Sequence, residues 1–211
     1  MSTVLLTGFE PFGGDAVNPS GDAVRLLAAH WDEPHELIVD VLPVTFAGAA
    51  ARLRALIDAH RPDVVVAAGL AGGRRAVGVE RVAVNLADAR IPDNAGAQPV
   101  DEACIEGAPA AAFATLPVKA IARAVAAAGI PAEVSHTAGT FVCNHVFFTA
   151  LDAVPAGTPA GFIHVPWAAG AAPAGQPALP IDDIVAALRI ALVTALDEPA
   201  AAPGLPGGAL H

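Results

Sequence analysis

The 211-residue sequence contains no tyrosine, one lysine and only two cysteines. No tyrosine can therefore act as acid, base or nucleophile. A P-loop for nucleotide phosphates needs a lysine directly after its glycines, and Lys119 has no such context. The formal net charge is −10, and no basic cluster exists beyond Arg74-Arg75, so we do not expect nucleic-acid binding. Two cysteines make no disulfide framework, and we expect reduced thiols in a cytoplasmic protein.

The sequence also lacks any apolar run long enough to span a membrane. Its N-terminus begins on a strand pattern and has no basic segment followed by an apolar one, so we expect no signal peptide. Hydrophobic residues make up 55% and charged residues 15%, which suffices for a large core. We expect a single α/β domain over residues 1–197 and a tail rich in Pro, Gly and Ala over 198–211.

Strand patterns alternate with helix patterns along the chain. Strands are expected at 3–8, 36–42, 63–69, 77–85, 132–136 and 161–166. Helices are expected at 18–30, 46–60, 115–128, in the segment after Thr140, and from a cap at Asp182 to about 196. This alternation predicts a three-layer α/β/α sandwich around a twisted, mostly parallel (mixed) sheet. Residues 88–109 fit no regular element, and so long a loop is usually functional.

The stretch from Thr137 to His145 joins a strand pattern to a helix pattern. With Thr140 as N-cap, Cys143 falls in the first helical turn, where free N–H groups and the helix dipole favour an anion. We therefore expect a lowered pKa for this thiol and more thiolate at neutral pH. The alternative is a buried structural cysteine, because free cysteine is among the most buried residue types.

A thiolate nucleophile needs a base within hydrogen-bond reach and a partner that orients the base. Among the seven histidines, His164 ends an apolar strand pattern that could return beside the Cys143 helix. It could equally be a hydrogen-bonded core residue. His145 follows Cys143 by two positions, and two such helical residues point apart. Glu80 could orient His164 if it points inward, as in a triad, or it could be a surface carboxylate paired with Arg81.

Other hydrolytic chemistries lack their motifs. The only serines are Ser2, Ser20 and Ser135, and none lies in a G-x-S-x-G elbow. There is no H-E-x-x-H or C-x-x-C pattern for a metal site. The thiol therefore remains the strongest candidate nucleophile.

Several long and unusual motifs occur in a fixed order. They are T-G-F-E-P-F-G-G at 7–14, N-P-S at 18–20, E-R-V-A-V-N at 80–85, D-A-R-I-P-D-N at 88–94, T-A-G-T-F-V-C-N-H at 137–145 and G-F-I-H-V-P at 161–166. Together they resemble the pyroglutamyl peptidase I, or pyrrolidone-carboxylate peptidase, family of cysteine peptidases. The resemblance runs from about Val4 to Leu196, so only the tail lies outside it.

The resemblance implies a Cys–His–Glu triad, with Cys143 as nucleophile, His164 as base and Glu80 as the orienting acid. It implies removal of an N-terminal pyroglutamyl (5-oxoproline) residue from peptides through an acyl-enzyme. Neither a metal nor an organic cofactor is expected. The resemblance further implies an intracellular α/β/α sandwich, and a homo-oligomer, because bacterial members are often tetramers.

The resemblance also implies a substrate pocket. The positions that match the lining of the lactam pocket are Phe9, Phe12, Asn18, Phe141 and Val142. Arg90 matches an arginine close to the catalytic site. Leu70 stands in the Gly-rich loop where a glutamine is expected. If the glutamine side chain bonds the substrate, affinity or selectivity changes here; if only its backbone does, the change is mild.

Other functions fit the same residues. One is a thiol hydrolase of the same fold that acts on another small acyl or amide substrate. Another is a non-catalytic small-molecule binder in which Cys143 only packs. A nucleoside-phosphorylase-like function rests on fold analogy alone.

Overall fold

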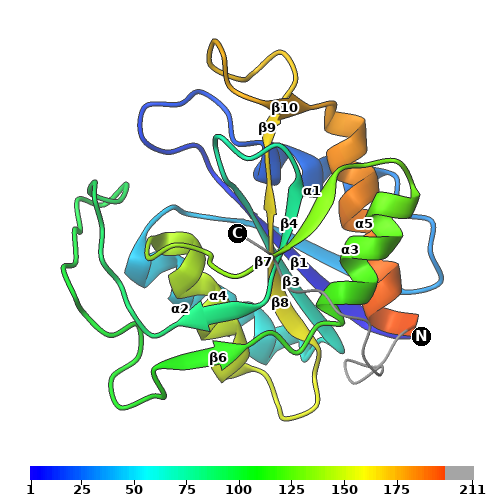
Figure 1. The fold of residues 1–211 in the computed structure, drawn as a ribbon. Helices are drawn as coiled ribbons and strands as arrows, with labels where there is room; N and C mark the ends of the chain where they lie inside the picture. Colours follow the sequence, from blue (N-terminus) through cyan, green and yellow to red (C-terminus); the bar gives the residue numbers. More distant parts are fainter. Residues whose placement is uncertain (198–211) are drawn as a thin grey trace.

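The computed structural model describes residues 1–197, and a six-stranded mixed sheet forms its centre (Figure 1). Its strands are β1 (Thr3–Phe9), β2 (Glu36–Leu42), β3 (Val64–Leu70), β4 (Val77–Glu80), β7 (Ala132–Ser135) and β8 (Ala160–Val165). Their order across the sheet is β2-β1-β3-β8-β4-β7. The neighbours are parallel except for β8 and β4, which pair antiparallel, so β4 and β7 run against the other strands.

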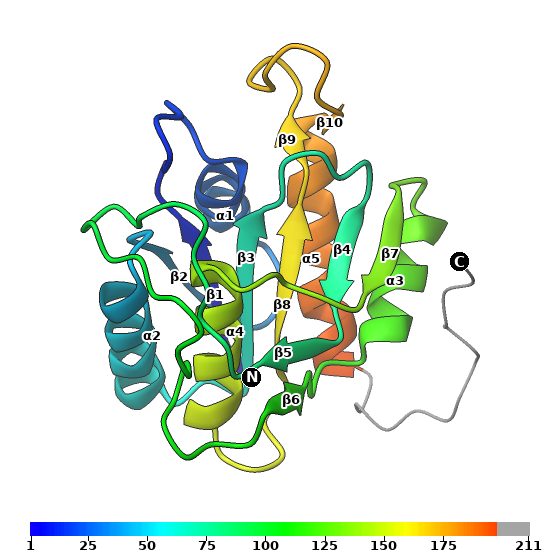
Figure 2. The ribbon, with the colours of Figure 1, turned by 60° about the vertical axis from the view of Figure 1, so that its left-hand side comes forward.

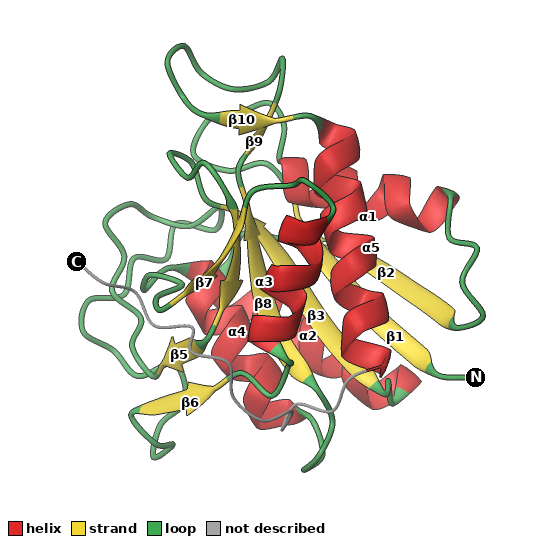
Figure 3. Ribbon diagram, turned by 45° about the vertical axis from the view of Figure 1, so that its right-hand side comes forward, coloured by secondary structure: helices red, strands yellow, loops and turns green. Residues whose placement is uncertain are grey.

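Helices cover both faces of this sheet. They are α1 (Pro19–Ala29), α2 (Phe46–His60), α3 (Val118–Ala127), α4 (Val142–Ala153) and α5 (Ile181–Asp197). Figure 3 shows α1, α3 and α5 on one face, with α2 and α4 behind the sheet. Each face has its own hydrophobic core with these helices. The predicted three-layer α/β/α fold is confirmed. None of the helices within residues 1–197 is long and apolar enough to cross a membrane.

The central strands contribute side chains to both cores in alternation, as a strand must. In β3, Val66 and Ala68 belong to the core under α1, α3 and α5, whereas Val65 and Ala67 belong to the core under α2 and α4. Every residue of β3 is buried, which explains its continuous apolar run.

Some predicted boundaries are wrong for identifiable reasons. The strand expected at 77–85 is two strands, because the chain leaves the main sheet at Arg81 and β5 (Val82–Val84) pairs instead with β6 (Ala111–Phe113). Helix α3 begins at 118 rather than 115, since the Thr115 amide donates to the Ala160 carbonyl. The short parallel pair of β9 (Trp167–Ala168) and β10 (Ala178–Leu179) was not predicted. Asp182 lies inside the first turn of α5 rather than at its cap.

The long segment between β5 and β6 passes beside α2 and α4 (Figure 2). As predicted, residues 88–109 contain no helix or strand. The buried Asp93 carboxylate anchors the segment, because it accepts hydrogen bonds from the amides of Phe46, Ala95 and Ala97. Burial alone would raise the pKa of Asp93, but these backbone donors outweigh it and lower the pKa. The segment is thereby fixed against the start of α2. The tail expected at 198–211 lies outside the described residues.

Candidate active site

Strand register brings two of the predicted catalytic residues to one face of the sheet. His164 of β8 pairs with Gly69 of β3 on one side and with Gly78 of β4 on the other. Paired residues of neighbouring strands point to the same face. Glu80 lies two residues beyond Gly78, so its side chain shares that face. This is the face covered by α2 and α4. The two strand partners of His164 are glycines, so neither carries a side chain on this face.

His164 and Glu80 form a buried pair. Nδ1 of His164 lies 2.8 Å from Oε1 of Glu80, with the residues 4% and 0% exposed. An ionised carboxylate can only accept, so Nδ1 carries the proton and Nε2 is left as the basic nitrogen. The alternative of a surface pair between Glu80 and Arg81 is wrong. The cation on Glu80 is Arg74, whose Nη1 donates to the same Oε1 at 2.8 Å.

Cys143 is the second residue of α4, so its predicted place in the first helical turn is confirmed. The predicted cap is wrong. Phe141 occupies the N-cap position without a side-chain cap bond, and the Thr140 hydroxyl donates instead to the Asp88 carbonyl at 2.7 Å. Thr140 therefore connects the segment before Cys143 to the long segment after β5.

Gly69 makes room for the thiol. A Cβ at this position would lie 2.9 Å from the Cys143 sulfur and 2.8 Å from the ring of Phe162, closer than real Cβ contacts allow. Only a glycine therefore lets the thiol approach β3 here. Because Gly69 is the β3 partner of His164, the sulfur lies against the strand position next to the imidazole.

The lowered pKa expected for Cys143 is wrong. Burial, and after it the negative charge of Glu80, raises the pKa of Cys143 to about 12, while Arg74 acts in the opposite direction. Burial also lowers the pKa of His164, against the raising effect of Glu80. Desolvation thus outweighs the favourable place at the helix N-terminus. Burial therefore favours a neutral thiol and a neutral imidazole, and the proton must move when the sulfur attacks.

A small pocket of about 10 Å³ lies beside the thiol. It is lined by Phe9, Phe12, Asn18, Val44, Phe141, Val142 and Cys143. Within this lining the rings of Phe12 and Phe141 contact each other, with centroids 6.1 Å apart and planes tilted by 36°. The structure therefore brings the predicted nucleophile together with most of the predicted lactam-binding residues. Val44 was missed, because it lies in an unremarkable connection between β2 and α2.

Asn18 is held rigidly in the pocket wall. It is the N-cap of α1, and its Oδ1 accepts from the Ser20 amide at 3.1 Å and from the Ser20 hydroxyl at 2.8 Å. Its Nδ2 donates to the Glu10 carbonyl at 2.9 Å. A side-chain amide carries two N–H groups, so one remains for a ligand.

Two predicted substrate residues lie outside the lining of this pocket. Leu70 is buried at the end of β3, and alternation points it to the face opposite Gly69. Arg90 is exposed in the long segment after β5. Contact of either residue with a bound substrate stays a prediction.

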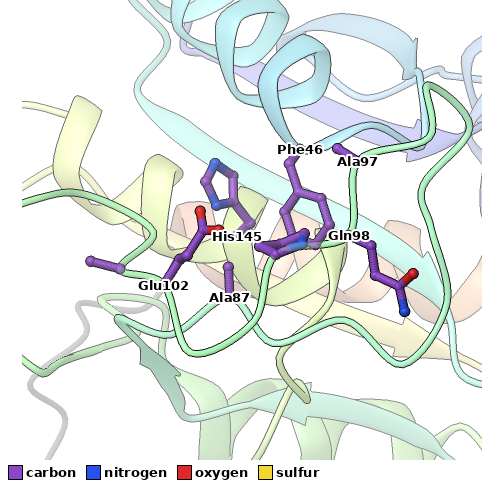
Figure 4. A pocket seen from close by; sticks show the side chains of 8 residues that line it. Phe46, Ala87, Ala97, Gln98, Glu102 and His145 are labelled. Atoms are coloured by element: carbon purple, nitrogen blue, oxygen red, sulfur yellow. The ribbon is translucent and has the colours of Figure 1, made fainter.

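His145 lines a different pocket, on the other side of Phe46. Figure 4 shows it between Phe46 and Glu102, and the rings of His145 and Phe46 meet edge to face with centroids 5.6 Å apart. Burial, with a smaller contribution from Arg54, lowers the pKa of His145. The pocket of Cys143 does not include His145, which agrees with their helical spacing.

The second thiol lies in a structural setting. Cys104 is half-buried, and its sulfur contacts the Val84 carbonyl and the Asn144 amide, each at 3.7 Å. Burial raises the pKa of Cys104 to about 11. Among residues 1–197, no group of three or more His, Cys, Asp or Glu side chains could hold a metal ion.

The sequence model of the pyroglutamyl peptidase family matches residues 2–198. The chain belongs to this family. The pyrrolidone-carboxylate peptidase of Cupriavidus taiwanensis is 49% identical over 217 residues, across the whole of both chains. The resemblance expected from the motifs is therefore confirmed.

Solved structures of the family have the same fold. Pyroglutamyl peptidase I of Bacillus amyloliquefaciens superposes with a TM-score of 0.86 at 44% identity, covering 94% of this chain and 98% of that one. The pyrrolidone carboxyl peptidase of Thermococcus litoralis gives a TM-score of 0.89 at 38% identity, covering 93% of this chain and 94% of that one. This chain thus shares the fold of the pyroglutamyl peptidase family as well as its sequence pattern.

Proposed function

We propose that this family member is a cysteine exopeptidase that removes the N-terminal pyroglutamyl residue from peptides. The observation that carries the proposal is one pocket in which the Cys143 thiol and the aromatic rings of Phe12 and Phe141 meet. The buried pair of His164 and Glu80 lies on the same face of the sheet. The names of the relatives support the reaction.

The pocket suits a flat, neutral lactam. Aromatic walls bind the ring of pyroglutamate, and the unused N–H of Asn18 can donate to a lactam carbonyl. An open N-terminal glutamate would bring an ammonium group and a carboxylate. Both would lose solvation against these walls, so the pocket selects against it.

In the acylation step, His164 takes the thiol proton at Nε2 as the Cys143 sulfur attacks the carbonyl carbon. The Glu80 carboxylate stabilises the resulting imidazolium through its bond to Nδ1. Free backbone N–H groups at the start of α4, including that of Cys143, stabilise the oxyanion. The imidazolium then protonates the leaving amine, the C–N bond breaks, and a thioester remains.

In the deacylation step, neutral His164 removes a proton from water while the water oxygen attacks the thioester. Collapse of the second tetrahedral intermediate breaks the C–S bond, returns the proton to sulfur and releases pyroglutamate. These steps use side-chain and backbone groups of this chain together with water.

A panel of fluorogenic amides tests the proposal. We expect rapid hydrolysis of the pyroglutamyl amide and little of the prolyl and glutamyl amides, because these carry an ammonium group where the lactam is neutral. Preference for the prolyl or glutamyl amide would instead indicate a thiol hydrolase with another substrate. A protein that hydrolyses none of them, and whose Cys143 alkylates slowly, would be a non-catalytic binder.

Leu70→Gln tests whether the missing glutamine matters. We expect the native protein to hydrolyse the pyroglutamyl amide. We expect the Leu70→Gln substitution to change KM more than kcat. The Leu70 side chain points to the face opposite Gly69. If the glutamine amide nevertheless bonded the substrate, that hydrogen bond would contribute on the order of 0.5–1.5 kcal/mol, or at most about tenfold in affinity. Both constants are measured on one pyroglutamyl amide. An inactive native protein with a strongly active variant would show that Leu70 redirects the pocket to another substrate.

We further propose that the protein works in the cytoplasm as a homo-oligomer, with a tetramer as the expected assembly. The family resemblance supports both statements. The reduced state of the two free cysteines is consistent with that compartment.

A further inference from the structure

The Gly-rich loop after β3 brings a guanidinium group onto the predicted triad. Nη1 of Arg74 donates to Oε1 of Glu80 at 2.8 Å, and Nη2 donates to the Thr137 carbonyl at 2.9 Å. Thr137 begins the segment that leads into Cys143. One side chain therefore connects the triad acid to the loop that positions the nucleophile.

Arg74 also balances a buried charge. Glu80 is 0% exposed, and its Oε1 is shared by Nη1 of Arg74 and Nδ1 of His164. Because His164 is neutral in the resting site, Arg74 is the cation that pairs with the carboxylate. A buried carboxylate without such a partner is strongly destabilised, since its lost hydration is not replaced.

The sheet leaves a place for this guanidinium. A Cβ on Gly78 would clash with Nη1 of Arg74. Gly78 is the β4 partner of His164, so the guanidinium lies on the same face of the sheet as the imidazole. The glycine on the other side of His164 admits the Cys143 sulfur in the same way. The glycines that flank the imidazole thus admit the thiol on one side and the cation on the other.

We propose that Arg74 is a positioning residue of this active site, which holds the Glu80 carboxylate against His164 and fixes the Thr137 segment ahead of Cys143. This role rests on the proposed peptidase function. It assigns no contact between Arg74 and the substrate.

The charge of Arg74 has a consequence for pH dependence. The charged groups that act on the thiol and the imidazole are Glu80 from β4 and Arg74 from the loop after β3. Burial dominates both groups, and Arg74 then lowers the pKa of Cys143 and of His164. Loss of this positive charge must raise both pKa values. Both limbs of the pH profile of kcat/KM should then move to higher pH.

The test compares Arg74→Met, Arg74→Lys and the matched control Arg75→Met. Arg75 is exposed one position further along, so its replacement removes the same charge away from the site. We expect Arg74→Met to lower kcat/KM on the order of 10- to 100-fold and to move both limbs upward. Arg74→Lys keeps the charge but not the forked geometry, so it should lose activity with little movement of the limbs. Arg75→Met should match the native enzyme.

A second readout separates this proposal from the proposed function. In a Cys104→Ala background, the pH dependence of Cys143 alkylation should shift upward in Arg74→Met whether or not the protein hydrolyses pyroglutamyl amides. Native activity and unshifted profiles in Arg74→Met would overturn the proposal. Lost activity with unshifted profiles would reduce Arg74 to a purely structural residue and overturn it too. If Arg74→Met does not fold, Arg74→Lys takes its place in the test. A native pH profile together with native activity in Arg74→Lys would overturn the proposal.

Discussion

Cys143→Ala is expected to abolish hydrolysis of pyroglutamyl amides while leaving the fold intact. The substitution removes one sulfur atom from the pocket, where it lies against Gly69. Without the sulfur no acyl-enzyme can form, and water alone must attack the amide. The measurements are kcat/KM on one pyroglutamyl amide and the melting temperature of the variant.

Cys104→Ala is the matched control for this experiment. Its sulfur contacts the Val84 carbonyl and the Asn144 amide, and Cys104 does not line the pocket of Cys143. We expect nearly native kcat/KM and at most a small loss of stability. Full activity in Cys143→Ala would end the cysteine-peptidase interpretation.

His164→Ala is expected to lower the acylation rate by roughly 10²–10⁴, the contribution of a lost general acid–base. The variant also leaves the Glu80 carboxylate with Arg74 as its remaining partner. Single-turnover kinetics on a pyroglutamyl amide measures the loss, and the melting temperature reports any accompanying change in stability.

His145→Ala serves as the comparison for the base. His145 packs edge to face on Phe46 in the neighbouring pocket and does not line the pocket of the thiol. Its replacement should act mainly on the melting temperature and leave kcat close to native. A larger kcat loss at His145, together with an active His164→Ala, would reverse the assignment of the base.

The sequence predicted those elements whose limits are marked by local chemistry. β2 and α2 have the predicted bounds, Glu36–Leu42 and Phe46–His60, because prolines follow both elements and the apolar pattern inside each is clear. The segment 77–85 alternates throughout, yet its halves belong to different sheets. The segment is divided because β4 and β5 pair with different strands. A local sequence pattern does not show which distant segments pair.

The site could be predicted in its residue types but not in its charges. The strand-to-helix pattern around Thr140 predicted the place of Cys143 in the first turn of α4. The predicted pKa had the wrong direction, because burial depends on the packed surroundings. Arg74 was visible only as one member of a basic pair. Its contact with Glu80 arises when the Gly-rich loop folds back over Gly78. The sequence held one signal for this contact. Gly78 lies inside the strand that carries Glu80, and a glycine within a strand often marks the close approach of another group.

The central claim is that the thiol of Cys143 performs the hydrolysis. The most direct measurement uses Cys104→Ala protein, in which Cys143 is the only thiol, and adds iodoacetamide in increments. Mass spectrometry gives the labelled fraction of Cys143, and hydrolysis of one pyroglutamyl amide gives the residual activity. The account predicts that activity falls in proportion to labelling and disappears when labelling is complete. Undiminished hydrolysis by fully labelled protein would contradict it.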